Sequence, residues 1–111
     1  MITDKLKELL ATRIKDIVDV GKLGMGGNTT SPLALDLDVP ITGTPTISTE
    51  KSNTNVVQIM VEEVGSNITG KLIREMGFFD GTEMLGRVNF EAVGPFSGTE
   101  RIQIFLTVEV E

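Results

Sequence analysis

Every even-numbered residue between 101 and 110 is apolar, and this alternation is the clearest pattern in the chain. One side of an extended segment is apolar: Ile102, Ile104, Leu106, Val108 and Val110. The other side carries Gln103, Thr107 and Glu109. The pattern predicts a β-strand that covers a core with one face and meets water with the other. A strand so near residue 111 either lies between neighbouring strands or leaves a free edge for another chain.

A second pattern, with apolar residues every three or four positions, predicts an amphipathic helix over residues 3–20. Its apolar stripe consists of Leu6, Leu9, Leu10, Ile14, Ile17 and Val18. Thr3 suits the N-cap, Asp4 lies near the positive end of the helix dipole, and Gly21 suits the stop. Such a stripe favours packing on the protein's own sheet, and packing on a neighbouring subunit is the alternative.

Residues 46–111 are predicted to form antiparallel β-structure. Besides the strand at 101–110, strands are expected at 44–50, 56–64, 72–79 and 84–93. Pro45 confines the first of these to a strand start or a sheet edge, and residues 52–55 are expected to turn. Asp80-Gly81 is a strong turn pair and predicts a hairpin.

Alternation also assigns the faces of these strands. In 56–64 the apolar face is Val57, Ile59 and Val61. In 84–93, Val88, Phe90 and Ala92 are expected to point inward. Arg87, Asn89 and Glu91 are expected to point outward, to water.

Residues 21–45 lack periodicity and are predicted to form an extended glycine-rich loop. Lys22 does not belong to a phosphate-binding loop, because Leu23 follows it instead of Ser or Thr and the segment follows a helix. Asp36 and Asp38 could hold calcium, but an EF-hand-type site needs more ligands at fixed spacings. We interpret both carboxylates as solvated.

These elements predict one domain, residues 1–111, of the mainly β (α+β) class. An N-terminal amphipathic helix is expected to precede an antiparallel β-sandwich or meander.

Charge and composition narrow the range of functions. The formal net charge of −6 argues against binding nucleic acid or an anionic membrane, because both require a positive face. No apolar run approaches the roughly 20 residues of a transmembrane helix. The first eight residues mix charges of both signs and are not typical of an export signal.

The chain has no Cys, His, Trp or Tyr. The usual general base, the thiolate nucleophile and the commonest metal ligands are therefore missing. A hydrolase based on Glu62, Glu63 or Asp80 remains as an enzymatic interpretation. Glu62 and Glu63 are adjacent in a strand and point to opposite faces, so they cannot act as an acid–base pair across one bond. We expect no enzymatic activity, no cofactor and no bound metal.

Three segments have a familiar order: Gly26-Gly-Asn-Thr-Thr-Ser-Pro-Leu-Ala-Leu-Asp36, Ile73-Arg-Glu-Met-Gly-Phe-Phe-Asp80 and Leu85-Gly-Arg-Val-Asn-Phe90. Together with the alternating strand at 101–110, they resemble a small structural module of tail, baseplate and tail-fibre proteins of tailed bacteriophages and related archaeal tailed viruses. That module has a glycine-threonine loop, then Ile-x-Glu-x-Gly-Leu-Phe-Asp, then Leu-x-Ala-Arg-x-x-Phe. The likeness covers roughly residues 21–111. Gly86 stands where alanine is usual, and Glu100-Arg101 where a lysine is usual.

Within these motifs, Gly77 is expected at a bulge or at a close approach of two backbones. Glu75 and Arg87 lie on adjoining predicted strands. Either they form an ion pair across the hairpin, which would fix its register, or they are two solvent-facing charges.

The resemblance implies a non-enzymatic virion structural protein, made in the host cytoplasm and assembled at the tail, baseplate, fibre base or neck. Its expected partners are copies of itself, in a homo-oligomer or ring, and other virion proteins, contacted through sheet edges and loops. No nucleic acid, membrane or small-molecule substrate is expected. The alternative is a ligand- or carbohydrate-binding β-sandwich that contacts the host surface. Its polar loop residues would be Asn28, Asp36, Asp38 and Asn67.

Overall fold

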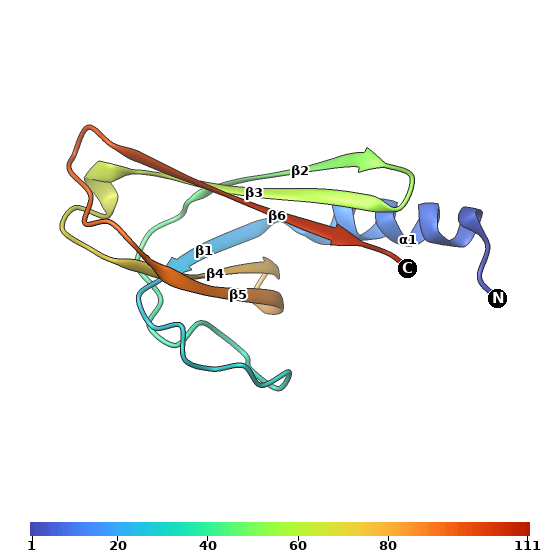
Figure 1. The fold of residues 1–111 in the computed structure, drawn as a ribbon, viewed down its shortest axis with the longest axis horizontal. Coiled ribbons are helices and arrows are strands. Elements are labelled where there is room, and N and C mark those ends of the chain that lie inside the picture. The colour runs from blue at the N-terminus through green and yellow to red at the C-terminus, as the bar shows by residue number, and fades with distance from the viewer.

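The computed structural model describes all 111 residues and contains one α-helix and six β-strands (Figure 1). The elements are α1 (Asp4–Ile17), β1 (Val20–Gly24), β2 (Thr46–Asn53), β3 (Val56–Val64), β4 (Ile73–Asp80), β5 (Glu83–Val93) and β6 (Arg101–Glu109). Two antiparallel three-stranded sheets, in the orders β1-β4-β5 and β2-β3-β6, enclose a common hydrophobic core. The predicted mainly β fold with an N-terminal helix is confirmed.

Helix α1 begins where the sequence predicts and ends earlier. Thr3 is the N-cap, and its Oγ1 accepts a hydrogen bond of 3.3 Å from Leu6 N–H. The predicted end at residue 20 is wrong, because α1 ends at Ile17 and Val18 is already extended. Asp19 N–H donates to Phe79 O, so the chain joins the β4 ladder before it reaches Gly21. With 14 residues and many charges, α1 is neither long nor apolar enough to cross a bilayer.

The C-terminal half of α1 packs on its own molecule, against β2 and β3. Ala11 is fully buried there, and Ile14 and Ile17 pack against the core. The remaining leucines of the stripe, Leu6, Leu9 and Leu10, are exposed. Figure 1 shows why: α1 continues past the end of the β1-β4-β5 sheet.

The prediction of a single loop over residues 21–45 is wrong, because the first part of this segment belongs to strand β1. Val20–Gly24 pairs with β4, with Lys22 opposite Gly77, and Leu23 is buried in the core. Glycine-rich segments have weak intrinsic strand preference, so this strand depends on its partner for its backbone hydrogen bonds. Residues 25–45 form no strand, apart from the isolated bridge between Gly24 and Pro40.

The β2-β3-β6 sheet follows the predicted alternation. Val57, Ile59 and Val61 are fully buried on β3, as predicted. On β6, Ile102 is buried and Ile104, Leu106 and Val108 pack against the core, as does Val110 just beyond the strand. β2 continues to Asn53, which is further than predicted, and the turn is limited to Thr54 and Asn55. β6 pairs only with β3 and is an edge strand.

The predicted hairpin between β4 and β5 is confirmed, with Asp80 opposite Glu83. On β5, Val88 is half-buried and Phe90 packs against the core, as expected. Ala92 is exposed, contrary to the prediction, because the register shifts between Ile73 and Glu75 of the partner strand. Arg87 and Asn89 do face away from the core, but a loop covers them instead of water.

Candidate functional site

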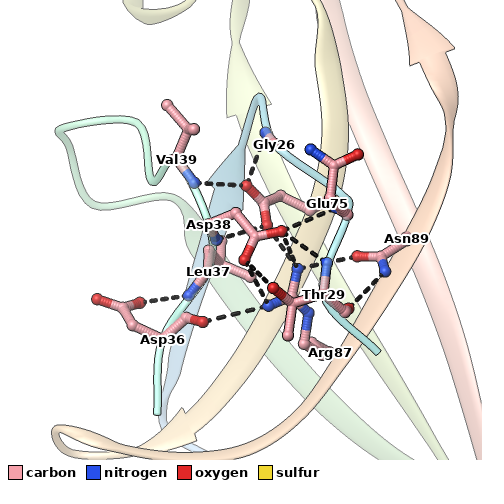
Figure 2. A network of polar contacts seen from close by, with 10 residues as sticks. Gly26, Thr29, Asp36, Leu37, Asp38, Val39, Glu75, Arg87 and Asn89 are labelled. Atoms are coloured by element: carbon pink, nitrogen blue, oxygen red, sulfur yellow. Dashed lines mark hydrogen bonds and ion pairs between the residues drawn. The ribbon is translucent and has the colours of Figure 1, made fainter. Parts of the chain in front are cut away.

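Residues 25–40, hereafter the anchored loop, cross the face of the β1-β4-β5 sheet that lies away from the core. A cluster of polar residues joins this loop to the sheet (Figure 2). We call the cluster the carboxylate network; it consists of Glu75 on β4, Arg87 and Asn89 on β5, and Thr29 and Asp38 on the loop.

Glu75 is the centre of the carboxylate network and has no exposed surface. It faces the loop because its neighbour Met76 points into the core, and side chains alternate along a strand. Oε2 accepts hydrogen bonds from Gly26 N–H (2.8 Å) and Val39 N–H (2.9 Å). Oε1 accepts from Asp38 N–H (2.9 Å) and from Arg87 Nη2 (2.8 Å). One carboxylate thus binds both ends of the anchored loop.

Gly26 allows this close approach of backbone to carboxylate. A Cβ at this position would lie 2.8 Å from Glu75 Oε2 and would collide with the Cβ of Asp38. A larger residue would therefore displace the loop from the acceptor that satisfies its N–H group.

Asp38 binds the first turn of the loop. Its Oδ2 accepts from Asn28 N–H and Thr29 N–H, both at 2.8 Å, and its Oδ1 accepts from Thr29 Oγ1 at 2.5 Å. These bonds, the Thr29 hydroxyl first, hold the pKa of Asp38 well below its usual range, and Arg87 lowers it further. The prediction that Asp38 is simply solvated is incomplete, since its side chain is only 22% exposed. Asp36 is 47% exposed and pairs with Lys22 at 3.4 Å.

Arg87 joins the two carboxylates and is almost completely covered. Its Nη2 lies 2.8 Å from Glu75 Oε1, 3.3 Å from Asp38 Oδ2 and 3.0 Å from Asn89 Oδ1. Its Nη1 donates to the backbone carbonyl of Asp36, and its buried Nε has no hydrogen-bond partner. Of the two sequence interpretations, the structure shows the ion pair across the hairpin. Asn89 Nδ2 donates to Thr29 O at 2.8 Å and adds a further link to the loop.

An apolar contact lies beside the carboxylate network. Leu37 and Phe79 are buried and meet Met84 above Gly77, where a Cβ would lie 3.0 to 3.3 Å from all three side chains. Gly77 thus makes room for side chains that pack over the strand, and neither the expected approach of a second backbone nor a register shift falls at this residue.

The middle of the anchored loop is apolar and projects into solvent. Leu33 and Leu35 are 84% and 85% exposed, although Leu37, two residues further on, is buried. The three leucines therefore occupy two kinds of position: Leu37 packs on the sheet and holds the loop, whereas Leu33 and Leu35 face solvent.

The carboxylate network supports the anchored loop on the sheet through hydrogen bonds. Its two carboxylates accept hydrogen bonds from five backbone N–H groups, those of Gly26, Asn28, Thr29, Asp38 and Val39. Such groups would be costly to leave unsatisfied in a loop whose backbone pairs with the sheet only near the bridge between Gly24 and Pro40. No group of three or more Asp or Glu side chains is placed to hold a metal ion.

The other carboxylates considered as catalytic candidates lie apart. Glu62 and Glu63 do point to opposite faces of β3, as predicted: Glu63 is buried and accepts from Asn67 Nδ2, whereas Glu62 accepts from Arg101 and Gln103 on β6. Arg101 lowers the pKa of Glu62, and Gln103 adds to that effect.

The carboxylate network contains residues that sequence reasoning did not assign. Thr29, Asp38 and Asn89 were not linked to Glu75 and Arg87, because periodicity carries no information about where a loop crosses a sheet. One signal was present: the sequence segments 26–36, 73–80 and 85–90, which stand out as motifs, all contribute to the network. No protein-family model matches the chain, and no curated protein matches its sequence.

Proposed function

We propose that this chain is a non-enzymatic structural protein of a tailed-virus particle. It assembles with copies of itself and with other virion proteins at the tail, baseplate, fibre base or neck. The observation that carries the proposal is the anchored loop, which presents Leu33 and Leu35 to solvent while the carboxylate network holds its base.

Exposed apolar residues on an ordered loop suit protein contacts. The loop loses its conformational freedom when the chain folds, so a partner that contacts it has little more to order. Burial of exposed leucine side chains then contributes directly to association. A carboxylate network used for catalysis would leave an acid or base free, whereas both carboxylates here are engaged by donors from the loop and from Arg87.

The alternative, a carbohydrate-binding module that contacts the host surface, receives less support. Of its four proposed polar residues, Asp38 accepts from the backbone N–H of Asn28, and the Asn67 amide donates to Glu63. Asp36 accepts from its neighbour Leu37 and pairs with Lys22. Binding of the purified protein to sugars on a glycan array would favour this alternative.

The test uses tailed particles produced by cells that encode this chain. Mass spectrometry of purified particles should detect the chain, and antibodies raised against it should label the tail in electron micrographs. L33S/L35S should reduce incorporation roughly tenfold or more, because loss of one interface anchor typically costs over 1 kcal/mol.

V64S/V93S is the matched control, because it also removes two exposed apolar residues but lies on β3 and β5. It should be incorporated as efficiently as the parent chain. Particles that lack the chain, together with a strictly monomeric protein in solution, would contradict the proposal.

A further inference from the structure

β6 presents an unpaired backbone edge along its whole length. The strand order is β2-β3-β6, so β6 has a neighbour on one side only. Its side chains alternate between the core and solvent, with those of the odd-numbered residues exposed.

The hydrogen bonds at the two ends of the β3–β6 ladder show which groups form that edge. Val110 N–H donates to Asn55 O at 2.8 Å, and Gly65 N–H donates to Glu100 O at 2.6 Å. Even-numbered residues of β6 therefore bond to β3, since hydrogen-bonded pairs alternate along an antiparallel ladder. The N–H and C=O groups that point away from β3 belong to Arg101, Gln103, Phe105, Thr107 and Glu109.

The two edges of this sheet differ in their protection against pairing. β2 carries Glu50 and Lys51, and its register shifts between Lys51 and Asn53. β6 has neither charge nor proline between Arg101 and Glu109 and pairs with β3 in unbroken register. Proteins usually interrupt exposed edges with charges, prolines or bulges, so an edge without them is suited to receive another strand.

We infer that β6 pairs antiparallel with β6 of a second copy, around a two-fold axis at Phe105, to form a continuous six-stranded sheet. This inference deepens the proposed assembly role and rests on it. In this register, Phe105 lies opposite Phe105 of the second copy, and Gln103 lies opposite Thr107. Arg101 lies opposite Glu109, twice, because an interface with two-fold symmetry repeats each contact.

Charge and length select this register. It overlaps all nine residues of β6 and places opposite charges at both ends. A shift by two residues in either direction overlaps two fewer and separates Arg101 from Glu109. The exposed faces are complementary as well, because Phe105 is 57% exposed and gains an aromatic partner across the axis.

The first test changes the residue at the axis. F105K places two like charges opposite each other without touching the core, and it should lower the mass measured by light scattering from twice 12.0 kDa to 12.0 kDa. S48K is the matched control, because Ser48, Met60 and Phe105 lie in one row across the sheet, with Ser48 at the opposite edge. S48K should remain dimeric.

The second test examines the register. E109K places a second positive charge opposite Arg101 and should weaken the dimer roughly tenfold or more, whereas E111K, with the same change of charge outside β6, should not.

The chain has no cysteine, so F105C and Q103C each introduce a single thiol. F105C should cross-link two copies on oxidation, since paired residues lie about 5.5 Å apart, within reach of a disulfide. Q103C should not cross-link.

The outcomes separate this inference from the proposed function. A dimer that F105K and E109K leave intact overturns the pairing of β6 and leaves assembly through other surfaces in place. A monomeric parent chain that still enters particles overturns the pairing alone. A monomeric chain that is absent from particles overturns both.

Discussion

Glu75 is a fully buried carboxylate, and three of its four hydrogen-bond partners are backbone N–H groups of the anchored loop. A buried charge is favourable only when it is well paired and hydrogen-bonded. Loss of Arg87 would leave Glu75 with three donors, whereas loss of the Glu75 charge would affect three N–H groups and Arg87 together. The carboxylate should therefore matter more to folding than its cation.

E75Q should lower the free energy of unfolding by about 3–5 kcal/mol, as expected when one partner of a buried ion pair is removed. The amide also places a donor among the N–H groups that surround it. R87M should lower the free energy of unfolding by less. Urea titration monitored by circular dichroism measures both, with the exposed E83Q as the control, which should change stability by under about 0.5 kcal/mol. If E75Q resembled E83Q, the loop would not depend on this carboxylate.

Protonation of Asp38 should make the protein less stable in acid. Because its pKa is lower in the folded chain than in the unfolded chain, the unfolded chain binds more protons in acid. The stabilisation from Asp38 is fully present above the unfolded pKa of about 4 and is lost as the pH falls through the folded value. The difference in free energy of unfolding between pH 7 and pH 3 should therefore be smaller in D38N than in the parent chain. D16N, which changes an exposed carboxylate of α1, should keep the parent's pH dependence.

At the scale of elements, the sequence predicted the strands that bury a single face. Apolar and polar residues alternate along β3 and β6 because one face of each strand meets the core and the other meets water. The residue types of these strands therefore predict their structure directly. β1 was not predictable, because Val20–Gly24 has few strand-forming residues and is ordered by β4, which lies far along the chain. Residues 18–20 likewise fit the helical pattern in the sequence, but pairing with β4 gives them an extended conformation in the structure.

The candidate site was predictable only in part, for a similar reason. Glu75 and Arg87 could be paired from sequence because they lie on strands joined by a short hairpin. Asp38 reaches them only because the anchored loop crosses the sheet, and no local pattern encodes that path.

The β4–β5 hairpin contains a compensated pair of residues. Phe78 lies opposite Gly86, and a Cβ at Gly86 would lie 2.6 Å from Phe78 Cε1. The Phe78 ring therefore occupies the space that a side chain at position 86 would need. G86A should cost about 1–3 kcal/mol of stability through overpacking. F78L/G86A should recover most of this loss in the same urea titration, whereas equal losses in the single and double variants would exclude the steric explanation.

The whole molecule is elongated, with extents of 48 × 29 × 24 Å. β2, β3 and β6 run along its longest axis, the shorter β1-β4-β5 sheet covers one end of them, and α1 lies at the other end (Figure 1). Apolar or unpaired features on the surface include the leucines of the anchored loop, the β6 edge and the leucines of α1. They lie on different elements, and separate surfaces allow one small chain to contact several neighbours.

The shape of the dimer distinguishes two of these surfaces. Pairing through β6 places two molecules side by side across strands that lie about 4.8 Å apart, so the dimer grows mainly in width. Association through the leucines of α1 would join the molecules at their ends and give a rod approaching twice the 48 Å length. Small-angle X-ray scattering of the parent chain should therefore give a maximum dimension well below twice that length. F105K should scatter as a monomer, with a radius of gyration close to the 14.7 Å of the Cα trace plus its hydration layer. A rod-like distance distribution that L6K/L9K abolishes would assign the contact to the helix and leave the β6 edge free.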